Sequence, residues 1–428
     1  MIRLALLAVV LAGCTVTKIL VRDTPGTPIP QADVYINGSR AGGTDSTGNL
    51  AVAMNGGDHL FARKLMYEHP SYRQNHGAGQ GWVIRAYQTS LVVQNDGSRS
   101  DVVANGPSAA PTLVLAPTNA LIGLHFVVSL YWDATQEELD ALRDRFVLAS
   151  EYLYNLTDGQ FVIEQVELAD DGQLWDSAEF QFHVDNTLRP FTTWTGGYLG
   201  SVGLQSPIIR MAPFSDNMYA SRSPNTIIHE FGHLGFGLQD EYIGFGAGPH
   251  FCTQAVHDNV SPAFKVDAPQ ASCAMDHQGY TSKLCSNQSA NPHHGGTYQF
   301  GSCWDTIRNG AYQDPAGPPG RWTLQTPDTR GAIPSTLPAI PAALRPVINV
   351  TNRVLHDLCK PFKFTHPQGA AMYGSTIWLR PSFWGGDFIL GQLDTGGALD
   401  VRGAHLGDTI TTPNSYVQVD ATMCTVTN

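Results

Sequence analysis

Two histidines four residues apart, on a segment with helix-start signals, constrain this chain more than any other feature. Ser223 can cap a helix, and Pro224 suits the first helical turn. His229 and His233 then lie one turn apart on the same face of that helix. The two imidazoles can therefore reach one point, which is the arrangement that a single zinc ion requires.

Glu230 stands directly beside the first of these histidines. Its place on the helix lets the carboxylate miss the metal and reach a water molecule bound to it. Zinc lowers the pKa of such a water toward about 7, and a nearby carboxylate can take its proton and later deliver it to a leaving amine. We therefore expect one catalytic zinc ion, with Glu230 as the general base.

Three glycines, Gly232, Gly235 and Gly237, lie inside and after this pair of histidines. Each costs about 1 kcal/mol relative to alanine in a helix interior. This cost is explained if the chain turns sharply here and so brings a third metal ligand back toward the two histidines.

The string from His229 to Tyr242, HEFGHLGFGLQDEY, resembles the pattern HEFGHxxxGLxDEY of the IgA-peptidase-type zinc metallopeptidase family. The resemblance implies a metzincin-like zincin fold and endopeptidase activity on a protein or peptide substrate, without identifying immunoglobulin as that substrate. The commonest metzincin pattern, HExxHxxGxxH, would place its third histidine at Gln239, and glutamine is a poor zinc ligand. We therefore expect Asp240 to be the third ligand, with Glu241 as the rival.

Further residues after the helix fit this family resemblance. Met275, in the segment Ser-Cys-Ala-Met-Asp, looks like a Met-turn that packs under the metal without binding it. Tyr242 and Tyr280 are candidates to stabilise an oxyanion. His293 or His294 could replace Asp240 as a ligand, and the sequence does not decide whether calcium also binds.

The first fourteen residues predict export. Arg3 precedes an apolar run from residue 4 to residue 11, which is too short to span about 30 Å of hydrocarbon. The run ends in Leu-Ala-Gly-Cys14, which resembles a bacterial lipobox and implies a lipid on Cys14. Thr15, in place of an aspartate, favours the outer membrane or cell surface of a bacterial envelope, with the lipid as the only membrane attachment. The alternative is an ordinary signal peptide with a chance cysteine.

The other cysteines favour disulfides, because six remain and the chain is expected to be exported. We expect the four that follow the histidine helix to pair among themselves, and the last two to form one bond. A zinc ribbon is disfavoured because no close CxxC pair is present. The six are Cys252, Cys273, Cys285, Cys303, Cys359 and Cys424.

Patterning divides the rest of the chain into regions. Residues 15–116 alternate short strands with turns, and about fifty of them resemble a transthyretin-like or carboxypeptidase-regulatory sandwich. Residues 117–310 are the expected zincin-like domain, 311–346 a Pro/Gly-rich connection, and 347–428 a small C-terminal β domain. The sandwich match uses Pro28, Ile29, Ala32, Val34, Asn37, Gly38, Thr44, Asp45, Gly48 and Leu50.

Within residues 117–310, a strand over 124–131 precedes a capping box at Thr135–Glu138, and Asp158-Gly159 ends the helix that follows. Further strands are expected over 161–168, 178–184 and 207–212, and, in the C-terminal domain, over 375–379, 388–390 and 416–419. The expected fold class is α+β: a zincin-like catalytic domain, with a twisted mixed sheet and an active-site helix, flanked by two β-sandwich-like domains. The apolar face of the first helix is Leu139, Leu142, Phe146, Ala149 and Leu153.

Composition excludes some function classes. Apolar residues make up 42% of the chain and charged residues 14%, as in a packed globular protein. A formal net charge of -12 disfavours nucleic acid as a partner. A surface lipoprotein without activity, binding protein or glycan through its β domains, is the main alternative, and the intact Glu230 argues against it. A serine hydrolase has no support because no G-x-S-x-G string occurs.

Overall fold

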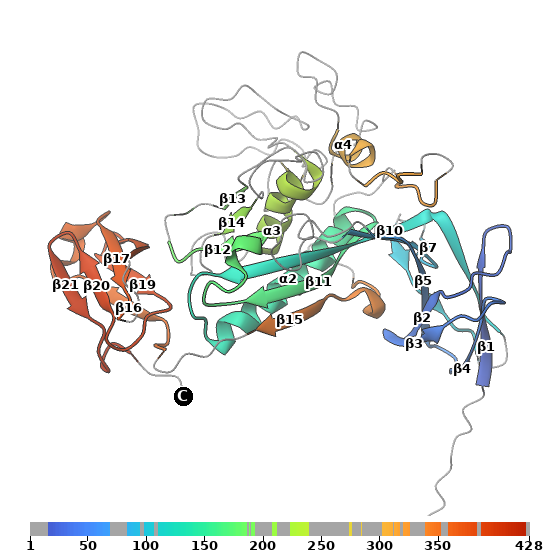
Figure 1. Cartoon of the computed structure of the whole chain (residues 1–428), viewed down its shortest axis with the longest axis horizontal. Coiled ribbons are helices and arrows are strands. Elements are labelled where there is room, and N and C mark those ends of the chain that lie inside the picture. Colours follow the sequence, from blue (N-terminus) through green and yellow to red (C-terminus); the bar gives the residue numbers. More distant parts are fainter. Residues whose placement is uncertain are drawn as a thin grey trace, which may run out of the picture.

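A computed structural model of the chain shows an α+β protein in which sheet predominates over helix (Figure 1). The helices and strands that the sequence predicts within residues 117–310 and 347–428 are present among the described residues. The structure describes residues 16–68, 84–94, 98–106, 110–185, 188, 190–192, 208–211, 223–238, 274–275, 284, 302–310, 312–316, 320–325, 339–351, 358–382 and 387–424.

One long strand, β10 (Thr112–Leu130), organises the fold. Its first residues pair in parallel with β1 (Val16–Asp23), its middle pairs antiparallel with β6 (Ile84–Thr89), and its second half pairs in parallel with β11 (Phe161–Ala169). The register shifts between Ala116 and Ala120, where Pro117 cannot donate a ladder hydrogen bond. Because β10 pairs with N-terminal strands and also with central strands, the two sets form one 13-stranded sheet among the described residues.

The N-terminal strands enclose a small core of their own. Strand β1 pairs with β4 on one side of this core, and β2 pairs with both β5 and β3 on the other side. Along β1, Thr17, Ile19 and Val21 are buried while the residues between them are more exposed, as a two-layer packing requires. The core includes Ile19, Val21, Val34, Leu60, Ala62, Leu113 and Leu115. The strand bounds are β2 Asp33–Ile36, β3 Ser39–Gly43, β4 Asn49–Ala53, β5 His59–Glu68, β7 Val92–Val93, β8 Arg99–Ser100 and β9 Val102–Val103.

The central sheet continues outward from β10. Strands β12 (Phe180–Phe182) and β14 (Ile209–Met211) run parallel to β10, and β13 (Phe191–Thr192) lies antiparallel at the edge. On the other side, β15 (Val347–Thr351) pairs in parallel with β11. The strands expected near these positions are confirmed with different ends, and β15, at the start of the predicted C-terminal domain, lies in the central sheet.

Helix α2 (Gln136–Leu156) begins and ends as predicted. The Thr135 hydroxyl accepts a hydrogen bond from the Glu138 N–H (3.2 Å), and the Glu138 carboxylate accepts one from the Thr135 N–H (3.0 Å). Asp158 and Gly159 then take the left-handed conformation, with φ of 51° and 73°. All five predicted apolar residues of the helix are buried.

Helix α3 (Ser223–Phe231) packs on the same face of the sheet as α2. Phe126 on β10 contacts Phe180 on β12 and Phe231 on α3, with ring centroids 5.2 and 5.1 Å apart, and Phe146 of α2 also contacts Phe180. This aromatic layer fixes the position of α3 against the sheet. The shorter helical segments are η1 Trp175–Ser177, η4 Gly232–Phe236, α4 Cys303–Asn309, η5 Ala342–Leu344 and η6 Gly369–Met372.

The C-terminal region is a small β unit closed by one disulfide. A four-stranded sheet runs in the order β18-β17-β20-β21, and β16 pairs with β19. The bond joins Cys359 to Cys424, as expected from the sequence, and ties the start of the unit to its end. The bounds are β16 Phe362–Thr365, β17 Thr376–Arg380, β18 Phe388–Gln392, β19 Ala398–Val401, β20 Thr409–Thr412 and β21 Ser415–Gln418.

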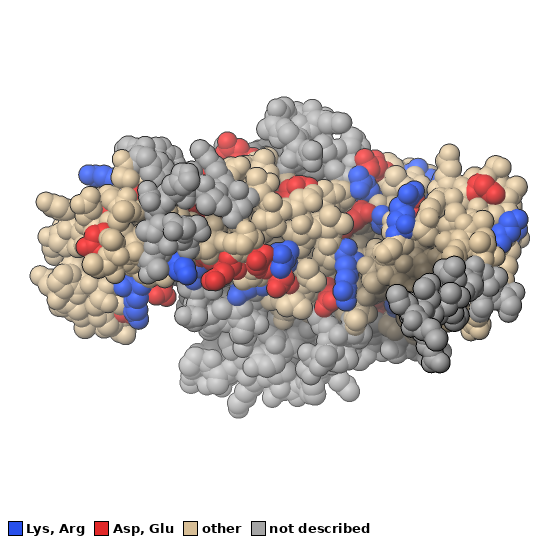
Figure 2. Space-filling model, turned by 90° about the horizontal axis from the view of Figure 1, so that it is seen from below, with Lys and Arg blue, Asp and Glu red and all other residues tan. Residues whose placement is uncertain are grey.

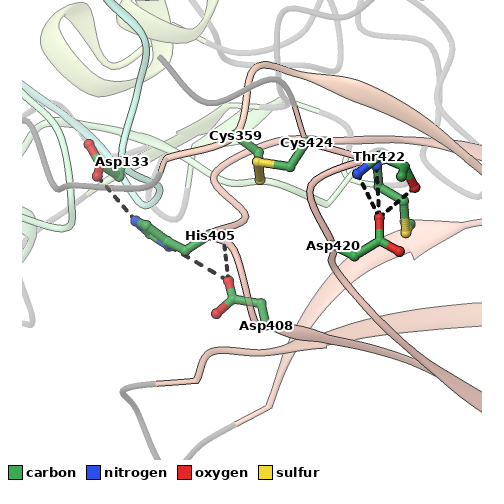
Figure 3. The surroundings of a disulfide bond; sticks show 8 residues. Asp133, Cys359, His405, Asp408, Asp420, Thr422 and Cys424 are labelled. Atoms are coloured by element: carbon green, nitrogen blue, oxygen red, sulfur yellow. Dashed lines mark hydrogen bonds and ion pairs between the residues drawn. A yellow bond between two sulfur atoms is a disulfide. The ribbon is translucent and has the colours of Figure 1, made fainter. Parts of the chain in front are cut away.

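Charged contacts hold this unit against the central domain. Arg402 forms an ion pair with Glu138, the same carboxylate that caps α2. Figure 3 shows the His405 side chain between Asp133 and Asp408, near the disulfide. The His405 Nε2 lies 3.3 Å from the Asp133 carboxylate, and its Nδ1 lies 3.6 Å from that of Asp408. The two regions are thus joined by buried and nearly buried charges.

We expect the contact made by His405 to weaken as the solution becomes alkaline. Burial alone lowers the pKa of His405, but the carboxylates of Asp133 and Asp408 outweigh burial and raise it from 6.5 to about 9. A raised folded-state pKa means that the stabilisation is complete below pH 6.5 and is lost as the pH rises through about 9. The difference between these two pKa values of His405 corresponds to about 3 kcal/mol in the free energy of unfolding.

The measurement is the free energy of unfolding at pH 6 and at pH 9.5, for the unmodified chain and for His405→Gln. The unmodified chain should lose more stability than the variant over this range. Equal losses in both chains would show that His405 does not carry the pH dependence.

The surface near α2 carries charges of both signs. On the face that Figure 2 shows, acidic and basic side chains lie beside one another along the middle. On α2, Arg143 pairs with Asp140 (2.8 Å) and with Asp144 (3.2 Å). None of the described helices is both long enough and apolar enough to cross a bilayer.

Candidate metal centre

The candidate centre lies where α3 changes into a wider turn. The α-helical part ends at Phe231, and residues Gly232–Phe236 continue as the π-helical turn η4. Gly237 ends this turn in the left-handed conformation, with φ of 70°. Single π turns inside α-helices often mark functional sites, and this one carries the second histidine of the pair.

The three glycines of this segment have two different structural roles. Only Gly237 supplies the turn that the sequence predicts for all three. A Cβ on Gly232 would lie 2.7 Å from the Met275 sulfur, and a Cβ on Gly235 would lie 2.2 Å from the Phe231 ring. Gly232 and Gly235 are therefore explained by close packing, because neither site has room for a side chain.

The two imidazoles converge through their Nε2 atoms. The Nδ1 of His229 donates to the carbonyl oxygen of Ala274 (3.0 Å), and the Nδ1 of His233 donates to that of Leu238 (2.7 Å). The two Nε2 atoms lie 3.2 Å apart. Both side chains are buried, with 2% and 5% of their surface exposed.

This geometry favours a cation between the two rings. A carbonyl oxygen only accepts, so each Nδ1 must carry the proton, and in a neutral imidazole the Nε2 then presents a lone pair. Two buried lone pairs aimed at each other repel unless a proton or a metal ion lies between them. Two zinc–nitrogen bonds of about 2.0–2.1 Å at a tetrahedral angle separate the nitrogens by roughly 3.3 Å. His229 and His233 therefore fit zinc.

Glu230 is buried beside this pair, with 4% of its surface exposed. The hydroxyl of Thr192, on the edge strand β13, donates toward the Glu230 carboxylate Oε2 (3.0 Å) and its backbone oxygen (2.9 Å). The carboxylate is therefore held from the sheet as well as from its own helix.

The turn at Ala274 and Met275 packs against the segment that carries the two histidines. Met275 is buried and packs against Gly232, while the Ala274 carbonyl orients His229. Acceptors of this kind fix the tautomer of a metal-binding histidine and raise its basicity. The sequence singles out Met275 for its packing, and the structure adds the role of the neighbouring backbone.

Aromatic side chains hold the far end of the π turn. The ring of Phe236 packs against Phe231 (5.0 Å between centroids) and against Tyr312 (5.4 Å). The Tyr312 hydroxyl donates to the carbonyl oxygen of Gly235 (3.1 Å). Burial raises the pKa of Tyr312 well above its usual value, so this hydroxyl keeps its proton.

The structure brings together part of the predicted site. His229 and His233 converge, Glu230 is buried next to His229 in the chain, Met275 packs against Gly232, and Cys303 is buried at the start of α4. Among the described residues, no group of three or more histidine, cysteine, aspartate or glutamate side chains that could hold a metal is present. Asp240, Glu241, Tyr242, Tyr280, His293, His294, Cys14, Cys252, Cys273 and Cys285 lie outside the described residues.

Sequence patterns did not single out Thr192, Tyr312 or the two carbonyl acceptors. Thr192 reaches Glu230 only because β13 pairs with β14 at the sheet edge. A strand-like run that begins at Phe191 was the one available signal for it.

Comparison of the chain with protein-family models, with curated proteins and with solved structures gives no match. A proposal for its function therefore depends on the residues of the centre itself.

Proposed function

We propose that this chain is a zinc-dependent metalloendopeptidase with a zincin-type catalytic domain, of the IgA-peptidase-type family that its HEFGHLGFGLQDEY string resembles. One observation carries the proposal: the Nε2 atoms of His229 and His233 converge to 3.2 Å while both Nδ1 atoms are bonded to carbonyl oxygens. The buried carboxylate of Glu230 beside this pair supplies the base that hydrolysis needs.

His229 and His233 would hold the zinc ion, with Asp240 as third ligand and Glu241 as its rival. When bound, zinc supplies Lewis-acid chemistry that makes water more acidic and polarises a carbonyl. A neutral histidine pair with one carboxylate is among the ligand sets found in catalytic zinc sites.

Glu230 would move the protons of the reaction. Its carboxylate accepts a proton from the attacking water, whose oxygen forms a bond with the carbonyl carbon of the peptide. The same proton then passes to the amide nitrogen as the carbon–nitrogen bond breaks, which leaves an amine and a carboxylic acid. The acid then loses the second proton of the water, to the amine or to solvent, and becomes a carboxylate. Tyr242 or Tyr280 would donate a hydrogen bond to the oxyanion that forms between these steps.

The sheet edge beside Glu230 favours a peptide as the substrate. Strand β13 pairs with β14 on one side, and its other side has no strand partner among the described residues. An extended peptide can add to such an edge through main-chain hydrogen bonds. Because Thr192 on β13 contacts Glu230, a peptide bound there would lie close to the base.

Export of the chain and a lipid on Cys14 are also proposals. The Cys359–Cys424 bond suits an oxidising compartment outside the cytosol. The enzyme would then act at the surface of a bacterial envelope.

The test is to measure zinc content and proteolysis in the same samples of the full chain. We expect about one zinc per chain and cleavage of fluorescein-labelled casein that stops with a chelator and returns when zinc is added. His233→Ala should bind little zinc and cleave nothing, whereas His59→Ala, at an exposed histidine of the N-terminal strands, should behave as the unmodified chain.

Absence of zinc in the unmodified chain, under conditions that load other zinc proteins, would refute the proposal. Zinc without cleavage of casein or of a mixed protein substrate would favour the alternative of an inactive lipoprotein that binds partners through its β domains.

A further inference from the structure

Thr192 lies where the sheet edge meets the active-site helix. Its strand, β13, pairs antiparallel with β14, and Thr192 stands opposite Ile209 in that pairing. The side chain of Ile209 is fully buried, which holds this part of the edge firmly against the core. The Thr192 hydroxyl therefore has a position fixed by the sheet, independent of α3.

The hydroxyl of Thr192 reaches two acceptors on the same residue. It lies 3.0 Å from Oε2 of Glu230 and 2.9 Å from the backbone oxygen of Glu230. One proton shared between these acceptors ties the end of the glutamate side chain to its own backbone and to β13. Threonine suits this role because its branched Cβ restricts χ1 on a strand.

A glutamate side chain without such a partner can move its carboxylate by several ångströms through its three rotatable bonds. A base must lie within hydrogen-bond reach of the proton that it takes. A displacement of about 1 Å can cost on the order of 100-fold in rate. Fixing the carboxylate before substrate arrives therefore has a large effect on turnover and little effect on metal binding.

We propose that Thr192 is a positioning residue that holds the carboxylate of Glu230 in its reactive orientation through a shared hydrogen bond from the edge strand β13. This inference rests on the proposed function, because it assigns Thr192 a part in the same hydrolysis. Thr192 touches neither zinc nor the reacting atoms and acts through Glu230.

The experiment compares Thr192→Val and Thr192→Ser in the full zinc-loaded chain, with fluorescein-labelled casein as substrate. Valine keeps the branched shape and strand preference of threonine but cannot donate. We expect Thr192→Val to lower kcat by about 10- to 100-fold, with KM and zinc content close to those of the unmodified chain. Thr192→Ser, which keeps the hydroxyl, should recover most of kcat. Thr112→Val, at an exposed threonine on β10, controls for the loss of a hydroxyl from a strand.

Each outcome decides for or against the role of Thr192. An unchanged kcat in Thr192→Val, or a serine variant as slow as the valine variant, would overturn it. If the zinc-loaded unmodified chain cleaves no protein, the proposed function has failed separately, and crystal structures of the zinc-loaded unmodified and Thr192→Val chains decide the point. A Glu230 carboxylate that moves from its position in the unmodified chain when Thr192 is replaced by valine supports the role, and an unmoved carboxylate refutes it.

Discussion

Replacement of Glu230 by glutamine should abolish most peptide hydrolysis and leave zinc binding intact. Glutamine keeps the size of glutamate, and its amide oxygen can still accept from Thr192 at the position of Oε2. It cannot take a proton from water, and general-base catalysis contributes about 10²- to 10⁴-fold. The metal should remain because His229 and His233 keep their bonds to Ala274 and Leu238.

The measurement is kcat on labelled casein together with zinc per chain, for the unmodified protein and for Glu230→Gln. Glu137→Gln, at an exposed glutamate in the first turn of α2, is the matched control and should retain full activity. A Glu230→Gln variant that keeps more than about a tenth of the activity would exclude Glu230 as the base, since the expected loss is at least 100-fold. Loss of zinc together with activity would instead place Glu230 among the ligands.

Removal of the Cys359–Cys424 bond should cause a large loss of stability. The bond spans 65 residues and closes the whole C-terminal β unit. A loop of this length limits the unfolded chain strongly, and removal of a native disulfide costs about 2–4 kcal/mol. The loss should appear first in β16 to β21, which we would follow by hydrogen exchange in increasing denaturant.

A comparison of three variants distinguishes a disulfide bond from two buried thiols that are not bonded. The variants are Cys359→Ser, Cys424→Ser and the double variant. If the two residues are bonded, each single variant already loses the cross-link, and the double variant should lose little more. Losses that add across the two positions would contradict a bond. Peptide mapping without reduction should also recover the peptide that contains both cysteines.

These predictions differ in how much of their basis was visible in the sequence. The helix α2, its cap at Thr135 and Glu138 and its end at Asp158 follow from signals within a few residues of one another. The helix that carries His229 follows from the same kind of local pattern, but the π-helical turn that carries His233 was not predicted. The disulfide between Cys359 and Cys424 was also expected, because the other four cysteines cluster elsewhere in the chain.

The pairing of the strands was harder to predict from the sequence than the helices or the disulfide. Nothing in the residues around 116 shows that β10 runs from the N-terminal strands into the central sheet. The hydrophobic pattern of a strand does not identify the strands with which it pairs. Strand β15 has the same kind of pattern as the C-terminal strands, yet it pairs with β11. Strand pairing brings together residues that are far apart in the chain, so it depends on how the whole core closes.

The sequence by itself determined the residue types of the centre: two histidines on one helical face with a glutamate beside them, and a methionine that could lie below. Helical periodicity acts over one turn, so it fixes these relations without the rest of the protein. Only the tertiary structure decided which carbonyl oxygens orient the histidines, why Gly232 and Gly235 carry no side chain, and that Thr192 holds Glu230. These contacts join α3 to a turn about forty residues later and to an edge strand about forty residues earlier, and only the packed core brings such distant segments within hydrogen-bond distance.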